Sequence, residues 1–291
     1  MQQLDEILNI LMEAVAAGAA EVLAVKQTHS VEAEYKDAKE LVTTADKRSD
    51  AAILRIFQQR FTVLDSSIVF QLEESGFSNI PGSRIAGADP LDGTNHFAAG
   101  GNMYSIQAHY VEAGVPQVGI VFQPEIYLPL DEDPQCLGRV SYAIRGGGAF
   151  VRRSRYTGQG FELEPAQPFI KRSRPSTRSY VACVPISTKM SSEERDRAIK
   201  VLCSGLIATT TGTGGAGGNI LMAVHGGQHV YANFGAGEDL DLIPPQVIAE
   251  EAGMTVWGID RVPPVWNYRK QPVVVAPSPE IAELFLRAAG F

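Results

Sequence analysis

The chain has 291 residues, of which 45% are hydrophobic and 20% are charged, a composition typical of a globular protein with one large or two medium domains. Its formal net charge of −8 argues against nucleic acid or an anionic membrane as the main partner, because both require a basic face. The three cysteines form no C-x-x-C pair, so the sequence predicts neither a disulfide framework nor a structural zinc site.

The first segment is predicted to be a long amphipathic helix over residues 2–27. Its apolar residues, from Leu4 to Val22, fall on one helical stripe. Asp5 and Glu6 stand where a secretory signal would be basic, and no apolar run approaches the roughly 18 residues that a membrane span requires. We therefore expect a cytoplasmic protein that is not exported.

Helix and strand patterns then alternate through the first half of the chain. A second helix is predicted for residues 47–59, with Asp46 near its start, where a carboxylate is favourable. Short apolar runs at 67–70 and 85–88 resemble strands that deliver acidic residues at their carboxyl ends. Residues 105–122 resemble a hairpin of an antiparallel sheet.

The second half alternates helices and strands as α/β units do. We place the division at residue 150, so that residues 1–150 form an α+β half with the acidic motifs and residues 151–291 form an α/β half. The elements expected in the second half are strands at 180–184 and 206–210 and helices at 191–202, 219–225 and 279–289.

The segment Asp89-Pro90-Leu91-Asp92-Gly93-Thr94 carries the strongest chemical indication. Proline restricts the preceding residue to an extended conformation and glycine favours a sharp change of direction, so both carboxylates can face one point. The Leu91 carbonyl lies between them as a third oxygen. Backbone N–H groups at Gly93 and Thr94 would seat phosphate oxygens at the next helix start. The alternative is a simple Asx-type turn, because these are ordinary turn residues.

Two other acidic segments can meet this motif in space, Glu73-Glu74 and Glu238-Asp239-Leu240-Asp241. Burying several carboxylates without a counter-charge would cost several kcal/mol for each, so such a cluster is either solvated or organised around a metal. Hard oxygen ligands suit Mg²⁺. The alternatives are that the glutamate pair is a solvated strand end, and that Glu238 or Asp239 replaces Asp241 as a ligand.

At these motifs the chain resembles the inositol monophosphatase family of magnesium-dependent, lithium-sensitive phosphatases, over nearly its whole length. The segment from Leu41 to Asp46 is similar to the family's L-V-T-x-x-D, Glu73-Glu74-Ser75 to its G-E-E-S, and Asp89 to Thr94 matches its D-P-[IL]-D-G-T. Asp241 stands ten residues before Glu251-Ala252-Gly253, which is the spacing of the late family motif. The resemblance implies a layered αβαβα sandwich and a homodimer.

The resemblance also implies a role for each motif residue. One magnesium ion would be held by Glu73, Asp89 and the Leu91 carbonyl, and a second by Asp89, Asp92 and Asp241. A water oriented by Glu73 and Thr94, with Asp46 behind them, would attack phosphorus in line. Two or three magnesium ions are expected, with lithium as an inhibitor.

The substrate implied by the resemblance is a small phosphorylated polyol, sugar or nucleotide. Its phosphate would rest on the Gly93 and Thr94 amides, and its alcohol would be bound by Gly215, Ala216, Asn233 and Asp241. The chain departs from the family pattern mainly on the alcohol side: at Leu72, Leu240, Asn233, Ile243-Pro244-Pro245 and the loop 235–238.

Three functions therefore follow from the sequence. The first is a magnesium-dependent phosphomonoesterase of the inositol monophosphatase kind. The second is a fructose 1,6-bisphosphate or 3′-phosphoadenosine 5′-phosphate phosphatase, and the basic run Lys171-Arg172-Ser173-Arg174 is either a solvated loop or a contact for a second phosphate. The third is a binding or regulatory member with weak catalysis.

Overall fold

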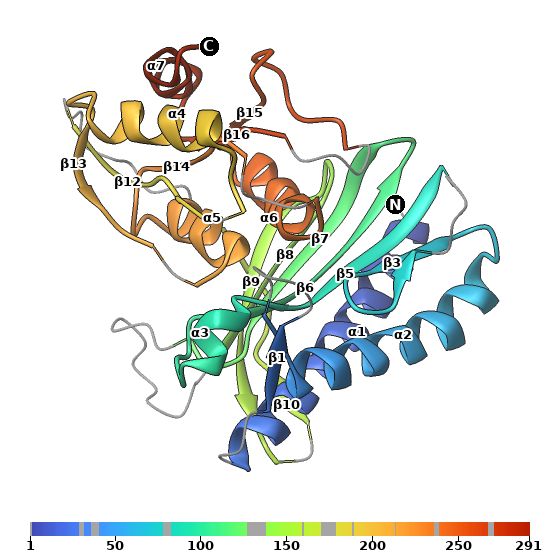
Figure 1. The fold of residues 1–291 in the computed structure, drawn as a ribbon. Helices are drawn as coiled ribbons and strands as arrows, with labels where there is room; N and C mark the ends of the chain where they lie inside the picture. Colours follow the sequence, from blue (N-terminus) through green and yellow to red (C-terminus); the bar gives the residue numbers. More distant parts are fainter. Residues whose placement is uncertain are drawn as a thin grey trace.

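The computed structural model describes residues 2–28, 32–35, 41–77, 83–126, 138–158, 160–169, 179–187, 189–212, 214–235, 239–266 and 271–291. These residues form five layers, in the order helices, large sheet, helices, small sheet, helices (Figure 1). The expected αβαβα sandwich is therefore confirmed.

The large sheet has the strand order β10-β9-β8-β7-β6-β5-β3-β4, with β11 paired to β9. Its neighbours are antiparallel except for β3 and β5, which are parallel and end at the same edge. The predicted hairpin is confirmed as β6 and β7, joined at Ala113 and Gly114. The strands of this sheet are β3 Val69–Leu72, β4 Gly76–Phe77, β5 Arg84–Asp92, β6 Ser105–Glu112, β7 Val115–Gln123, β8 Gly138–Ile144, β9 Gly148–Tyr156, β10 Phe161–Leu163 and β11 Gln167–Pro168.

Helices α1 (Gln2–Gln27) and α2 (Thr44–Leu64) cover one face of the large sheet. Their apolar stripes meet the sheet in one core that includes Leu11, Phe57 and Ile106. α2 begins earlier than predicted because Thr43 caps it: the Thr43 hydroxyl accepts from the helix amides while Asp46 accepts from the Thr43 amide. A two-stranded ladder of β1 (Ala33–Tyr35) and β2 (Leu41–Thr43) leads into this cap.

α1 corrects one expectation. The sequence predicted no segment long and apolar enough to cross a membrane, but α1 is such a segment by length and composition. In the fold, however, Ile7, Leu11 and Val15 are fully buried against α2 and the sheet. A core helix that is buried on two sides carries apolar residues around much of its circumference. It can therefore match a membrane-spanning helix in length and hydropathy.

The other face of the large sheet packs against α5 (Ala216–His225) and α6 (Asp239–Glu251). Gly119 of β7 lies so close to the Pro244 carbonyl of α6 that any side chain there would overlap it. Beyond these helices lies the small sheet, β13-β12-β14-β16-β15, which α4 and α7 cover on its outer face. The remaining elements are α3 Thr94–Ala98, β12 Tyr180–Cys183, α4 Ser192–Leu202, β13 Ile207–Thr210, β14 Val230–Asn233, β15 Thr255–Trp257, β16 Val273–Ala276 and α7 Pro279–Ala289.

The large sheet extends past residue 150. β9 continues to Tyr156, and both β10 and β11 pair with it. A division at residue 150 would cut β9, so we propose that the two halves divide after Pro168.

Candidate active site

An irregularity in β5 brings the two aspartates of the central motif to one face. Residues three apart on a regular strand point to opposite faces. Here Asp89 pairs with Gln107 and Asp92 with Ser105, so β5 uses one residue more than β6 over the same stretch. This bulge turns Asp92 to the side that Asp89 already faces.

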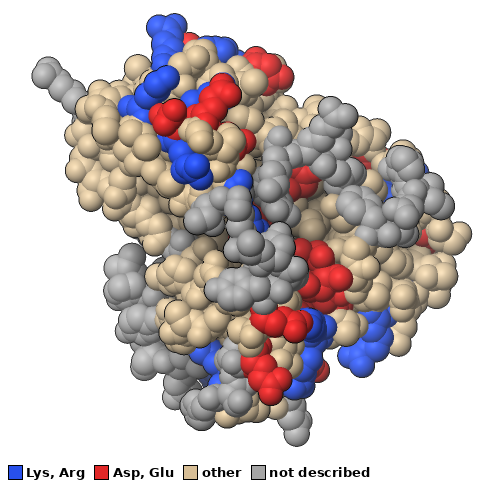
Figure 2. Space-filling model, viewed as in Figure 1, with Lys and Arg blue, Asp and Glu red and all other residues tan. Residues whose placement is uncertain are grey.

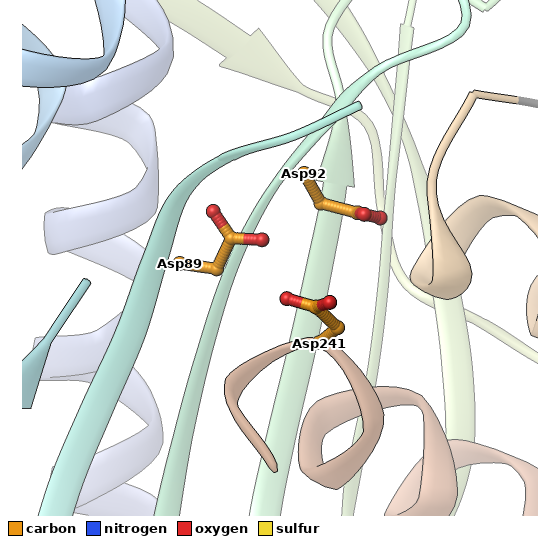
Figure 3. A group of neighbouring side chains, drawn as sticks. All are labelled: Asp89, Asp92 and Asp241. Carbon is orange, nitrogen blue, oxygen red and sulfur yellow. The ribbon is translucent and has the colours of Figure 1, made fainter. Parts of the chain in front are cut away.

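A third carboxylate reaches the same point from the second half of the chain. Asp241 lies in the first turn of α6, and one oxygen from each of Asp89, Asp92 and Asp241 lies within 4.8 Å of the others. Figure 3 shows the three side chains grouped together, with Asp89 and Asp92 coming from β5 and Asp241 from the start of α6. Asp89 and Asp92 are buried, with 1% and 6% of their surface exposed.

The cluster is strongly acidic. Burial raises the pKa of Asp89 well above its usual range, and the neighbouring charges of Glu73, Asp241 and Asp92 raise it further. Burial likewise raises the pKa of Asp92 to about 6, although hydrogen bonds to its carboxylate oppose the shift. On the face shown in Figure 2, acidic side chains gather near the middle. Such a group of carboxylates is stabilised by a bound cation.

Asp92 is held by the start of α5. Its two oxygens accept hydrogen bonds from the Ala216 and Gly217 amides, each at 3.0 Å, and the Ser105 hydroxyl donates to it at 3.1 Å. A side chain at Gly215 would overlap the Asp92 carboxylate. The amides also explain why α5 begins at Ala216 rather than at the predicted Asn219, because Asp92 satisfies N–H groups of its first turn.

Thr94 and Asp46 form a hydrogen-bonded pair beside the cluster. The Thr94 hydroxyl lies 2.9 Å from Asp46 Oδ1 and 3.0 Å from the Leu91 carbonyl oxygen. The other Asp46 oxygen accepts from the Thr43 amide at 2.7 Å and from its hydroxyl at 2.6 Å. Burial raises the pKa of Asp46 against the opposing effect of these bonds.

The turn after β3 places Glu73 in the cleft that Asp89 also lines. Asp50 of α2 accepts hydrogen bonds from the Glu74 amide at 3.1 Å and from the Ser75 hydroxyl, so it fixes the conformation of this turn. Ser49, one residue earlier, donates to the Pro90 carbonyl at 2.8 Å. α2 therefore holds both acidic segments of the first half in register.

Two adjoining hollows open at the cluster. The first is a cleft of about 130 Å³. The second is a cavity of about 480 Å³, which extends from the cluster to the small sheet. The cleft is lined by Leu41, Glu73, Asp89, Leu91, Asp92, Gly93, Thr94, Asn95, Lys189, Gly214 and Asp241.

The predicted site residues lie in or beside these hollows. Glu73, Gly93 and Thr94 line the cleft, and Gly215, Ala216 and Asn233 line the cavity. Asp46 lies next to Thr94, whose hydroxyl donates a hydrogen bond to it. Gly93 has a φ of 97°, which allows the chain to turn from β5 into α3.

The structure decides between two of the three acidic residues that were candidates for the cluster. Asp241, not Asp239, joins Asp89 and Asp92 in the cluster. Glu238 lies outside the described residues, as do most of the loop 235–238 and the basic run 171–174.

Sequence reasoning missed four residues of the site. Asn95 and Lys189 line the cleft, while Ser49 and Asp50 support it from α2. For α2 a sequence pattern was available: Asp46, Ser49 and Asp50 stand at i, i+3 and i+4, a polar group on a helix face that is otherwise buried. No local pattern marks Lys189.

Comparisons with known proteins agree with the fold. The family described as the inositol monophosphatase family matches residues 3–290. An inositol-1-monophosphatase from Synechocystis sp. is 33% identical over 118 residues, which is 40% of this chain and 40% of that protein. The chain thus matches about two fifths of the length of this curated relative.

Solved structures match over nearly the whole chain. The extragenic suppressor protein SuhB from Bartonella henselae has a TM-score of 0.75 at 16% identity, covering 98% of each chain. An IMPase/NADP phosphatase complexed with Mg²⁺ and phosphate has a TM-score of 0.69 at 17% identity, covering 99% of this chain and 95% of that one. At these identities the structures establish the fold, and the family match establishes descent: the chain belongs to the inositol monophosphatase family.

Proposed function

We propose that this protein is a magnesium-dependent phosphomonoesterase that hydrolyses a small phosphorylated polyol, sugar or nucleotide. The observation that carries the proposal is the convergence of Asp89, Asp92 and Asp241 in a cleft that also contains Glu73 and Thr94. Its family membership supports the same reaction class.

The residues of the cluster fit magnesium. All the side chains that converge there offer carboxylate oxygens, the ligands that Mg²⁺ prefers, and Asp89 and Asp92 are too buried to be stabilised by solvent. Glu73, Asp89 and the Leu91 carbonyl would hold one ion, and Asp89, Asp92 and Asp241 a second. Bound magnesium would polarise the phosphoryl group and lower the pKa of the attacking water.

The protein's own groups orient the water and receive its proton. The Thr94 hydroxyl donates toward Asp46, which leaves a Thr94 lone pair free to accept from a water in the cleft. As the water oxygen bonds to phosphorus, its proton can pass along Thr94 to Asp46, whose burial favours the protonated form. The bond from phosphorus to the alcohol oxygen breaks, and water in the adjoining cavity can protonate the leaving oxygen.

The test is phosphate release by the purified protein, with magnesium and with EDTA. The substrates would be inositol 1-phosphate, fructose 1,6-bisphosphate, 3′-phosphoadenosine 5′-phosphate and several sugar phosphates. We expect release that requires magnesium and is lost in Asp92→Asn. The matched control is Asp196→Asn, which makes the same change at an exposed position of α4 and should retain activity.

Release that persists in EDTA or in Asp92→Asn would contradict the proposal. Magnesium binding without release from any ester would favour the third function, a binding or regulatory member with weak catalysis.

Three finer expectations are part of the proposal: inhibition by lithium, a homodimer and a cytoplasmic location. They rest on the resemblance to the family. Activity assays with lithium chloride and sedimentation equilibrium test the first two directly, and fractionation of the source cells tests the third.

A further inference from the structure

Strand β14 forms part of the wall of the cavity beside the cluster. Tyr231 and Asn233 of this strand both line the cavity. They stand two residues apart on one strand, so their side chains share a face. The residues between and before them, Ala232 and Val230, point the other way and pack in the core under α4 and α7. The inner face of β14 therefore presents a phenol and an amide to the space where the alcohol of a substrate would lie.

The side chain of Asn233, which the family resemblance assigns to the alcohol, is engaged within the protein at both ends. Its Oδ1 accepts a hydrogen bond from the Gly235 amide at 3.0 Å. Its Nδ2 donates to the Tyr231 hydroxyl oxygen at 3.1 Å. Asn233 therefore fixes the orientation of the Tyr231 hydroxyl, and any contact that it makes with a substrate passes through Tyr231.

The Tyr231 hydroxyl retains a hydrogen that it can donate. A phenol has one O–H donor and accepts through its oxygen, and the bond from Asn233 uses the oxygen alone. Among the described residues, none accepts the Tyr231 hydrogen. Tyr231 is 1% exposed, and a buried donor is normally hydrogen-bonded. The hydrogen is therefore available to a group inside the cavity.

The hydroxyl lies on the side of the cavity that adjoins the cluster. Burial raises the pKa of Tyr231 well above its ordinary value, and the hydrogen bond from Asn233 opposes this shift. Three groups that line the same cavity raise the pKa further by their charge: Cys183, Asp241 and Asp92. Interactions between charges weaken with distance, so the phenol lies near the carboxylates. It also stays protonated, and hence a donor, at neutral pH.

Given the proposed function, we infer that Tyr231 donates a hydrogen bond to the ester oxygen that leaves phosphorus. As the water attacks, the bond from phosphorus to this oxygen breaks, and its electron pair stays on the oxygen. The Tyr231 hydroxyl stabilises the developing negative charge and keeps its own proton, while water in the cavity supplies the proton of the product alcohol. A donor oriented in advance stabilises this charge more than it stabilises the intact ester. Tyr231 is thus a catalytic residue and Asn233 its positioning residue.

The test is Tyr231→Phe, which removes the hydroxyl and keeps the ring. The first substrate is the alkyl phosphate that the wild type hydrolyses fastest. We expect kcat to fall about a hundredfold, as when one donor of an oxyanion hole is removed, with KM nearly unchanged. For p-nitrophenyl phosphate the loss should be about tenfold smaller, because its leaving anion is stable without a donor. The inhibition constant of inorganic phosphate, which has no leaving group, should stay the same.

The matched control is Tyr142→Phe. It removes the same hydroxyl from a half-buried tyrosine of β8 that lines neither hollow, so kcat should not change. Titration of activity with magnesium, carried out on wild type and Tyr231→Phe, should give the same half-maximal concentration. This separates a role at the leaving oxygen from an effect on the position of Asp241.

Three results would overturn the inference while the proposed function stands. The first is an unchanged kcat in Tyr231→Phe. The second is an equal loss on the alkyl and the p-nitrophenyl ester. The third is recovery of kcat at higher magnesium, which would show that Tyr231 acts through the cluster. Absence of phosphate release from every ester by the wild type would instead refute the proposed function, and this inference with it.

Discussion

Gly215 determines how closely α5 approaches the carboxylate cluster. The Ala216 and Gly217 amides reach the Asp92 carboxylate because residue 215 has no side chain to separate them. Here the requirement for glycine is one of space, since its φ of −124° is open to any residue. The absence of a side chain at Gly215 is thus part of the geometry that holds the Asp92 carboxylate.

Replacing this glycine should therefore damage catalysis more than stability. In Gly215→Ala the new methyl group displaces Asp92, and we expect kcat/KM to fall about a hundredfold, the loss that a displacement near 1 Å causes in an active site. Steady-state phosphate release measures the effect. Gly160→Ala is the control, because a side chain at Gly160 would meet no atom within 4 Å. Full activity in Gly215→Ala would show that Asp92 does not need this support.

Asp89 serves the proposed function, but its ionised form destabilises the metal-free protein. Its folded pKa is raised, first by burial and then by Glu73, Asp241 and Asp92, so the folded chain holds its proton more tightly than the unfolded chain does. The resulting stability is fully present below the unfolded pKa of 3.8 and is lost as the pH rises through the folded pKa. As the pH rises through the folded pKa of Asp89, the metal-free protein loses this contribution and gathers like charges in the cluster.

Asp89→Asn should consequently abolish magnesium-dependent activity and stabilise the metal-free protein. In EDTA at pH 8 we expect a higher Tm than for the wild type, by about 2–4 °C for each kcal/mol of repulsion removed. The gain should shrink on acidification toward pH 4. Thermal unfolding at both pH values measures it. A variant that is less stable than the wild type at pH 8 would contradict this account.

At the scale of elements, α2 holds the site together. Its first turn presents Asp46 to Thr94, Ser49 bonds to the Pro90 carbonyl, and Asp50 fixes the turn that carries Glu73. One face of α2 therefore positions two acidic segments, the turn that carries Glu73 and the central motif. We regard Asp50 as a positioning residue, because it acts through Glu73.

Asp50→Ala should weaken metal binding rather than remove the chemistry. Without its acceptor oxygens the turn at Glu74 and Ser75 loses two hydrogen bonds, and Glu73 loses its fixed position. We expect the magnesium concentration at half-maximal activity to rise about tenfold or more, with kcat at saturating magnesium changed much less. Titration of activity with magnesium separates the two quantities. The comparison is Asp65→Ala, which removes an acceptor at the other end of α2, where Asp65 pairs with Arg84.

Much of the fold was predictable because its patterns are local. The stripe of α1, the β6–β7 hairpin and the breaks at proline and glycine in the central motif depend on neighbouring residues. β16 was missed because its four residues are buried on both faces, and a short apolar run of this kind has no periodicity to identify it.

The convergence of Asp89, Asp92 and Asp241 could be predicted from the sequence, but the contacts that support it could not. Asp92 depends on amides that follow it by more than a hundred residues in the chain. Lys189 lies at the cleft only because β12 and α4 pack where they do. Contacts of this kind arise from tertiary packing and leave no spacing in the sequence.

At the scale of the whole molecule, the space between the large sheet and its inner helices contains polar as well as apolar groups. His109 of β6 is fully buried beside Gly87, which makes room for its ring. Neither ring nitrogen has a hydrogen-bond partner among the described residues. Burial lowers the pKa of His109 to about 3, so the folded protein keeps this histidine neutral.

This histidine should make the protein sensitive to acid. Below the ordinary pKa of 6.5 the unfolded chain binds a proton at His109 that the folded chain excludes until about pH 3. The free energy of unfolding therefore falls across this interval, by up to about 1.4 kcal/mol per pH unit. His109→Gln should remove this one-proton contribution, which urea unfolding between pH 6.5 and 4.5 can measure. Equal slopes for the two proteins would contradict a buried neutral His109.

The acidic residues of the site come from widely separated parts of the chain: Asp89 and Asp92 of the cluster and Glu73 of the cleft lie in the first half, and Asp241 lies in α6. During synthesis on the ribosome, the large sheet can assemble well before α6 has emerged. In that interval the face that α6 will cover is open, and Asp89 and Asp92 remain in contact with water. Under the proposed function, tight magnesium binding would become possible only late in translation, so the ion would stabilise the finished chain rather than guide the early steps of its folding.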